Sequence, residues 1–119
     1  MSNRSKEKGS KYERDVRDYL IVNDVDYERL RQVGVEDEGD GVIRGHHHDY
    51  TVCELKAENR IDLPGYLREL EREKDFFAKH RSLDPNRVGG LVLVKRRMAR
   101  IGQSYVVTTL DDYFQIRGD

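Results

Sequence analysis

The chain is poor in cysteine, in which small secreted proteins are rich, and in long hydrophobic runs, which membrane proteins require. It contains one cysteine, two prolines and no tryptophan, and hydrophobic residues make up only 36% of its 119 residues. The single cysteine, Cys53, excludes an internal disulfide and a multi-cysteine zinc site, so we expect a reducing, cytoplasmic location. No apolar run approaches the roughly 20 residues of a membrane span, and the first residues lack the apolar stretch of a secretory signal. We therefore expect no membrane partner, and a single domain over residues 1–119 with a modest core.

Charge of neither sign dominates the composition. The chain has 22 basic and 23 acidic residues and a net charge of −1, which excludes a uniformly basic protein that coats DNA. The signs are nevertheless separated, because residues 4–17 and 95–100 are basic and residues 24–40 are acidic. Basic segments that grip phosphates and an acidic segment that holds cations are compatible with a nuclease, although a well-mixed surface has the same total.

The apolar periodicity predicts alternating helices and strands. After a flexible basic segment at 1–9, we expect helices at 10–22, 64–80 and 110–116 and strands at 27–33, 42–44, 50–56, 90–94 and 104–108. The order helix, three strands, helix, two strands, helix predicts an α/β sandwich, with a central mixed five-stranded sheet flanked by helices.

The expected strand 50–56 carries the most informative triplet, Glu54-Leu55-Lys56. Side chains two residues apart on a strand point the same way, so Glu54 and Lys56 share one face while Cys53 and Leu55 face a core. A carboxylate and an ammonium projecting together suit phosphodiester hydrolysis, in which a metal and a cation offset charge on the phosphate. Alone, such a triplet in so charged a chain more often marks an ordinary ion pair.

Two further carboxylates belong to the same hypothesis. Asp40 precedes the strand at 42–44, and a hairpin between the two strands brings Asp40 to Glu54, so that two carboxylates and a strand carbonyl can bind Mg²⁺ or Mn²⁺. Glu13 lies at the margin of the first helix's apolar stripe and points partly inward. The alternatives are an Asp-Gly turn at Asp40 and an ion pair between Glu13 and Arg17.

Together these residues resemble a known family. The segment Lys8-Gly-Ser-Lys-Tyr-Glu-Arg-Asp15, the Asp40 before a strand and Cys53-Glu-Leu-Lys56 are similar to archaeal-type Holliday junction resolvases, members of the PD-(D/E)xK nuclease superfamily. The likeness covers roughly residues 8–60 by motif and the remainder by order of elements. It implies a restriction-endonuclease-like fold and a single Mg²⁺-dependent nuclease domain, with Mn²⁺ as a substitute. It also implies a homodimer that makes paired incisions in four-way DNA junctions, in a prokaryotic or virus-infected cell.

By this resemblance, Glu13, Asp40 and Glu54 form the acidic metal site with the Leu55 backbone carbonyl, and Lys56 is the catalytic lysine. Arg31 matches a basic residue that leads into the active-site loop of the family. The complete set of residues expected to contact DNA is Lys8, Lys11, Arg31, Lys95, Arg96, Arg97 and Arg100.

The chain departs from the family pattern in its acidic loop. It has Val35-Glu-Asp-Glu38 where the resolvases carry a small, polar or basic loop, and Gly41 stands between Asp40 and the strand. Asp37 or Glu38 therefore remains an alternative that shares or replaces the role of Asp40. Two other functions also remain open, namely another nuclease of the superfamily (restriction-like, repair or single-strand-specific) and a non-catalytic DNA-binding module on the same fold.

The run His46-His47-His48-Asp49 suggests a transition metal, since imidazoles suit Zn²⁺ or Ni²⁺. Three consecutive residues in a tight turn rarely converge on one ion, however. We therefore expect an exposed hairpin turn here, with DNA contact as the alternative.

Overall fold

The computed structural model describes residues 3–32 and 34–116, and the side chains from residue 9 onward. Within these ranges three α-helices, two short 3-10 helices and five strands follow one another. In chain order they are α1 (Asn3–Val22), β1 (Tyr27–Arg29), β2 (Gly41–Arg44), β3 (Tyr50–Lys56), α2 (Leu63–His80), η1 (Pro85–Arg87), β4 (Val88–Val94), η2 (Ile101–Gln103), β5 (Tyr105–Val107) and α3 (Leu110–Phe114).

The predicted elements are all present, and two of their bounds differ from the prediction by more than two residues. The first helix begins at Asn3, so the backbone of residues 3–9, expected to be flexible, belongs to α1. The strand expected over 27–33 ends at Arg29; the next residue, Leu30, still donates its N–H to the Asp40 carbonyl oxygen, and residue 33 lies outside the described residues. Asp62 and Pro64 define the start of α2, since the Asp62 side chain caps the helix and Pro64 occupies its first turn.

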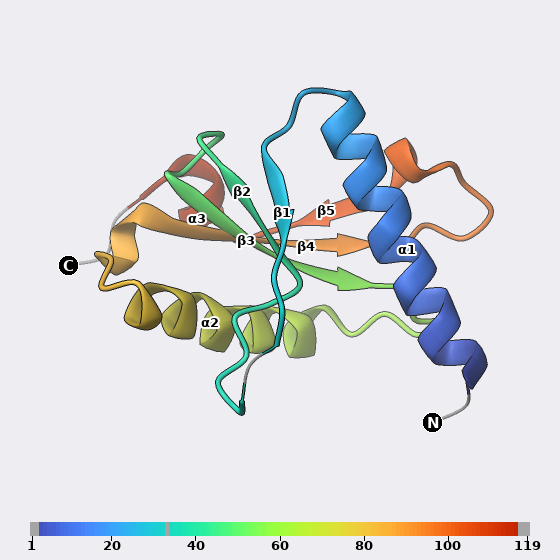
Figure 1. Cartoon of the computed structure of the whole chain (residues 1–119), viewed down its shortest axis with the longest axis horizontal. Helices are drawn as coiled ribbons and strands as arrows, with labels where there is room; N and C mark the ends of the chain where they lie inside the picture. Colours follow the sequence, from blue (N-terminus) through green and yellow to red (C-terminus); the bar gives the residue numbers. More distant parts are fainter. Residues whose placement is uncertain (1–2, 33, 117–119) are drawn as a thin grey trace.

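The sheet has the order β1-β2-β3-β4-β5. Only β3 and β4 are parallel, and the other neighbours are antiparallel, so the predicted mixed five-stranded sheet is confirmed. Figure 1 shows α1 crossing one face of the sheet and α2 running along the other. The parallel pair places the carboxyl ends of β3 and β4 at the same end of the sheet, and the candidate site lies at this end.

Each face of the sheet has its own core. On the α1 side, Tyr12 and Val16 of the helix pack with Cys53 and Leu55 of β3. On the α2 side, Leu70 and Phe77 pack with valines of the central strands. Because β3 is covered on both faces, all five of its interior residues are buried, including the polar ones.

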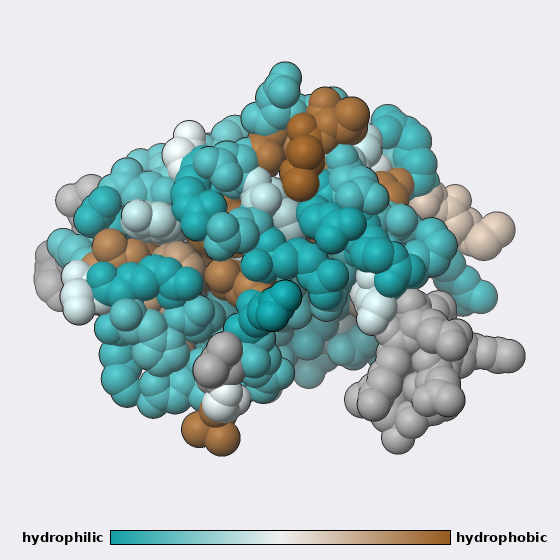
Figure 2. All heavy atoms as spheres, in the orientation of Figure 1, coloured by the Kyte–Doolittle hydropathy of each residue, from teal (hydrophilic) through white to brown (hydrophobic). Residues whose placement is uncertain are grey.

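The face of the molecule drawn in Figure 2 is mostly hydrophilic. It is the face seen in Figure 1, with separate hydrophobic patches near the end of α1 and at the tip of the loop between β1 and β2. Val35, in this loop, is 95% exposed.

Candidate active site

The site begins where the loop before β2 lies against the end of β3. The N–H of Asp40 donates to the Cys53 carbonyl oxygen at 3.0 Å, and its carboxylate Oδ2 accepts from the Leu55 N–H at 2.8 Å. The close approach depends on Gly39, which has a φ of +100° and whose Cβ would stand 2.8 Å from Val52 Cγ1. Asp40 is thus fixed to the end of β3, as the predicted hairpin requires. Gly41, which follows it, is simply the first residue of β2.

The backbone of Leu55 lies beside the Asp40 carboxylate. Its N–H is bound by Asp40, and in an extended strand the carbonyl of one residue points to the same side as its N–H. The Leu55 carbonyl predicted as a metal ligand therefore faces the side of β3 on which Asp40 lies.

Glu13 reaches Asp40 from α1. Its Oε2 accepts from Arg29 Nη2 at 3.0 Å, whereas Arg17 pairs with Asp18, so the alternative of a Glu13–Arg17 ion pair is wrong. Burial, followed by the negative charge of Asp40, raises the pKa of Glu13, and Arg29 opposes this rise. The structure therefore brings Glu13 to Asp40, and it adds a cation, Arg29, that the sequence reasoning did not assign to the site.

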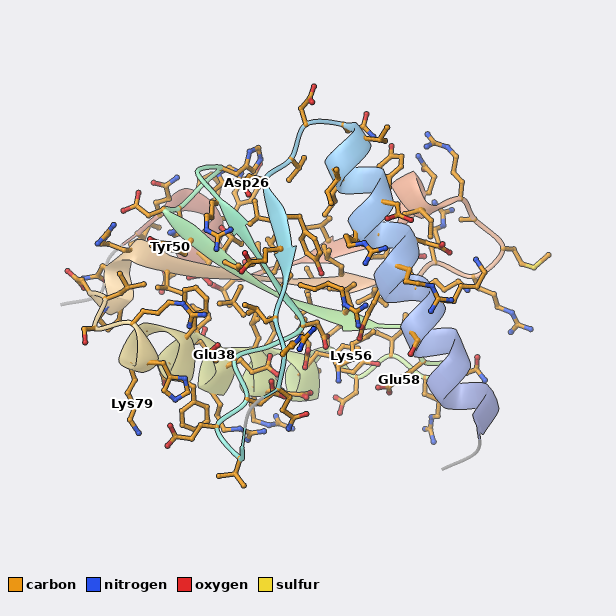
Figure 3. All side chains as sticks on the ribbon, viewed as in Figure 1. Asp26, Glu38, Tyr50, Lys56, Glu58 and Lys79 are labelled. Carbon is orange, nitrogen blue, oxygen red and sulfur yellow. The ribbon has the colours of Figure 1, made fainter. Side chains whose placement is uncertain are left out.

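Glu54 and Lys56 face α2 side by side, as their spacing predicts. Glu54 is only 4% exposed. The Lys56 Nζ lies 3.0 Å from Glu69 Oε2, 3.7 Å from Glu54 Oε2 and 3.9 Å from Glu58 Oε1. Burial lowers the pKa of Lys56, but these three acids outweigh it, so its pKa lies above the ordinary value and the side chain is an ammonium at neutral pH. Figure 3 shows Lys56 and Glu58 together near the end of β3.

Helix α2 supplies two carboxylates that the sequence reasoning missed. Glu54, Glu69 and Glu73 each offer an oxygen, and these oxygens lie within 4.8 Å of one another, the one such group of metal-ligating side chains in the described part of the chain. The predicted set of Glu13, Asp40 and Glu54 shares only Glu54 with this group. A signal was present in the sequence, because Glu73 occupies a helical stripe whose other members are buried and apolar: Tyr66, Leu70 and Phe77.

The carboxyl groups strongly perturb one another. Burial, and then the contact with Asp40, raises the pKa of Glu54 far above its usual range, and Glu69 and Glu73 contribute further. Burial also raises the pKa of Glu73 to about 8. For Glu69, contacts with Glu54 and Lys56 outweigh burial and hold its pKa below the ordinary value. Several acids facing one ammonium leave excess negative charge, which protons or cations can offset.

The acidic loop before β2 forms ion pairs with the carboxyl end of α2. These pairs distinguish Glu38 from Asp37, the two residues considered as alternatives to Asp40. Glu38 Oε2 lies 2.6 Å from both His80 Nδ1 and Arg81 Nη1, and Glu36 Oε1 lies 2.7 Å from His80 Nε2. Glu38 is therefore paired with two side chains at the carboxyl end of α2. Asp37 instead accepts from the Gly39 N–H and lines a hollow of about 140 Å³ with Glu69 and Glu73.

The basic cluster after β4, residues 95–100, begins at the same end of the sheet as the carboxyl end of β3. Val94 pairs with Lys56 across the parallel strands, and the Lys95 N–H donates to the Lys56 carbonyl oxygen at 2.8 Å. No residue that the structure describes forms an ion pair with any of Lys95, Arg96, Arg97 and Arg100. Cations without acidic partners beside the site are suited to contact a phosphate backbone.

The remaining predicted DNA contacts differ in their surroundings. Lys11 forms an ion pair with Asp15 at 2.7 Å, one turn along α1, and remains mostly exposed. Arg31 is exposed on the loop after β1. The side chain of Lys8 lies outside the described ones.

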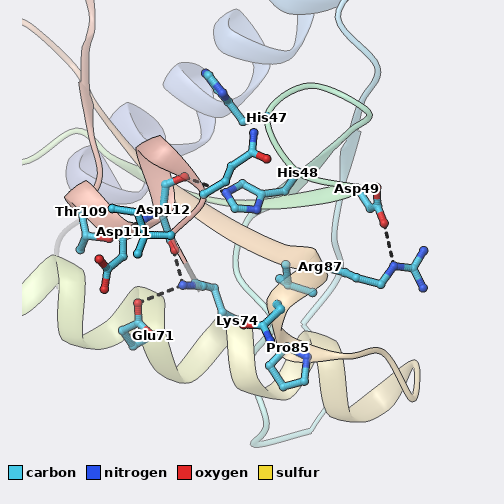
Figure 4. A pocket seen from close by; sticks show the side chains of 14 residues that line it. His47, His48, Asp49, Glu71, Lys74, Pro85, Arg87, Thr109, Asp111 and Asp112 are labelled. Carbon is cyan, nitrogen blue, oxygen red and sulfur yellow. Dashed lines mark hydrogen bonds and ion pairs between the residues drawn. The ribbon is translucent and has the colours of Figure 1, made fainter. Parts of the chain in front are cut away.

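The histidine run forms the exposed turn that was expected between β2 and β3. His46 and His47 are exposed, and His48 Nε2 lies 2.8 Å from the Asp112 carbonyl oxygen. A cavity of about 460 Å³ opens beside this turn (Figure 4), at the end of the sheet opposite Lys56. Two ion pairs line it, Lys74 with Asp112 at 2.8 Å and Arg87 with Asp49 at 2.7 Å.

Apolar side chains are exposed along the β5 edge and on α3. On β5, Tyr105 and Val106 are 46% and 62% exposed. On α3 and directly after it, four further side chains are more than half exposed: Leu110, Tyr113, Phe114 and Ile116. β5 is an edge strand of the sheet, and no described strand pairs with its outer side.

Comparison with known proteins adds no relative. Neither a scan against protein-family models nor searches of curated proteins and of solved structures found a match. In the ranges 3–32 and 34–116, no helix is both long enough and apolar enough to cross a membrane.

Proposed function

We propose that this chain is a Mg²⁺-dependent endodeoxyribonuclease that cuts branched DNA, as a Holliday junction resolvase does. The observation that carries the proposal is the convergence of Glu13, Asp40, Glu54 and the ammonium of Lys56 at one end of β3. These residues come from α1, the loop before β2, and β3. Their order, together with the order of elements, agrees with the resemblance to PD-(D/E)xK nucleases and with a restriction-endonuclease-like fold.

The oxygen chemistry of the donor set suits a hard divalent cation. Asp40 and Glu54 offer carboxylate oxygens, the Leu55 carbonyl faces the side of β3 on which Asp40 lies, and Glu13 lies beside Asp40. Oxygen-only sites of this kind prefer Mg²⁺ or Mn²⁺. When bound there, Mg²⁺ would supply neutralisation of phosphate charge and a lowered pKa for a water ligand.

The chain's own residues provide the rest of the chemistry. Lys56 keeps its positive charge because three acids surround it, so it can stabilise the charge that builds on a phosphate and hold the attacking water by a hydrogen bond. The cluster from Lys95 to Arg100 begins beside the Lys56 backbone and can hold the flanking DNA backbone.

Dimerisation belongs to the same proposal, because paired incisions in a four-way junction need two active sites related by symmetry. The apolar surface on β5 and α3 is where we place the second copy. An uncovered sheet edge with exposed aromatic and aliphatic side chains is a natural pairing surface.

A substrate panel tests the activity. The purified protein is incubated with Mg²⁺ and a synthetic four-way junction, and in parallel with linear duplex, flap and single-stranded DNA. Symmetric nicks confined to the junction are expected. Equal cutting of all substrates would replace the resolvase with a general nuclease of the same superfamily, and binding without cleavage would replace it with a non-catalytic DNA-binding module.

Two lysine variants test the site. Lys56→Ala should reduce cleavage by about 10²–10³-fold while junction binding is retained, because it removes a charge-stabilising group. Lys79→Ala is the matched control, since Lys79 also pairs with a glutamate but lies near the other end of α2. Full activity in Lys56→Ala would overturn the assignment of this lysine.

A further inference from the structure

Glu73 is the least satisfied polar group of the site. Its side chain is 2% exposed, and neither carboxylate oxygen has a hydrogen-bond partner among the described residues. Burying a carboxylate without partners costs several kcal/mol, so such a group is normally paired, protonated or bound to a metal. No described lysine or arginine lies within ion-pair distance of it; Lys56 pairs with Glu54 and Glu69 instead.

The oxygens of Glu73 are directed at other carboxylates. One oxygen each from Glu54, Glu69 and Glu73 lies within 4.8 Å of the others. Glu69 and Glu73 are one helical turn apart on α2, and Glu54 approaches from β3, so two rigid elements fix the group. Two such elements hold the three oxygens at the close spacing that cation ligands require.

The group can be reached from solvent. The hollow of about 140 Å³ beneath the acidic loop is lined by both Glu69 and Glu73. Its wall also carries Asp37, whose negative charge favours the approach of a cation. The hollow therefore brings solvent up to the α2 side of the three carboxylates.

We propose that Glu54, Glu69 and Glu73 form a second divalent-cation site, distinct from the one at Asp40 and Glu13 and built on α2. The two sites share Glu54, which lies between Asp40 on one side and the α2 glutamates on the other. Three carboxylates select a hard ion such as Mg²⁺ or Mn²⁺. Because it shares Glu54, the second site rests in part on the proposed function, although ion binding itself requires no DNA.

The competing explanation is a proton shared among the three carboxyl groups. A proton would also relieve the repulsion among the carboxylates. In that case Glu73 would not bind a divalent ion. Glutamine tests the difference, because it has nearly the shape of glutamate but supplies a neutral amide in place of a carboxylate.

Calorimetric titration of the full chain with Mn²⁺, with electron paramagnetic resonance to count free ion, measures the sites directly. Wild type is expected to bind two Mn²⁺ per chain. Glu73→Gln and Glu69→Gln should each lose one ion or weaken it at least tenfold. Glu71→Gln is the matched control, because Glu71 lies on the same helix between them but is exposed and pairs with Lys74. It should bind as wild type does.

The outcomes separate this inference from the proposed function. Glu13→Gln should weaken the other ion and leave the α2 ion in place. If Glu69→Gln and a folded Glu73→Gln both bind Mn²⁺ as wild type does, the second site is wrong and the shared proton is right. If Glu73→Gln does not fold, Glu69→Gln decides alone, because Glu69 is only half-buried. Two bound ions with no cleavage of any DNA would contradict the nuclease and leave the second site standing.

Discussion

One carboxylate oxygen of α3 makes two contacts with other elements of the fold, and this gives a quantitative prediction. Asp112 Oδ2 accepts from Lys74 Nζ at 2.8 Å and from the Gly90 N–H at 3.0 Å. It thereby connects α3 to α2 and to β4, and the side chains of Lys74 and Asp112 are only 12% and 16% exposed. Asp112→Ala removes both contacts and should destabilise the fold.

The expected loss in the free energy of unfolding follows from the groups that Asp112→Ala leaves without a partner. The Gly90 N–H loses its side-chain acceptor, which costs about 1–3 kcal/mol for a buried donor. Lys74 keeps Glu71 at 3.0 Å, so the lost ion pair adds about 1 kcal/mol rather than the full cost of an isolated buried charge. The sum is about 3 kcal/mol. Since unfolding entropy is about 2.1 cal/mol/K per residue, or about 0.25 kcal/mol/K for this chain, Tm should fall by about 12 °C.

Urea and thermal unfolding followed by circular dichroism measure this difference. Asp111→Ala is the matched control, because Asp111 is exposed and also lies in the first turn of α3, so both variants remove the same charge from the helix start. Asp112→Asn separates the two contacts, since it retains an acceptor for Gly90 but no charge for Lys74. If Asp112→Ala is within about 1 kcal/mol of Asp111→Ala, the reasoning about buried partners is refuted.

Three further predictions concern other surfaces. Glu36 and Glu38 raise the pKa of His80 above 6.5, so its stabilisation is full below pH 6.5 and is lost as pH rises through the raised value. His80→Gln should therefore lower the urea midpoint at pH 6 and leave it unchanged at pH 9; an equal loss at both would contradict this. Phe114→Glu, which charges the apolar surface of α3, should convert a dimer into a monomer in light scattering, and an unchanged mass would place the interface elsewhere. Arg97→Ala should weaken junction binding and reduce the salt slope by about one, whereas an unchanged slope would exclude phosphate contact.

The strand and hairpin parts of the site were predictable because their geometry is local. A period of two puts Glu54 and Lys56 on one face of β3 whatever surrounds them. The hairpin register, with Gly41 opposite Cys53, then brings Asp40 beside the end of β3. The cap of α3 is equally local, since Thr109 directly precedes the helix and its Oγ1 accepts from the Asp112 N–H. The Asp112 side chain, however, reaches Lys74 and Gly90, contacts that no local pattern contains.

The α2 half of the site could not be predicted, because helix periodicity fixes a face but not what that face meets. The sequence places Glu73 on a stripe with Leu70 and Phe77, and a stripe of that kind predicts burial. Whether a buried carboxylate there meets a lysine, a backbone N–H or other acids depends on how α2 docks against β3. That docking follows from the connection after Lys56 and from packing of the valine core. The spacing of the acidic residues predicts neither of these. A charged residue within an apolar stripe is therefore the useful signal: it indicates that an unlike partner must be found in three dimensions, and here the structure supplies two more carboxylates.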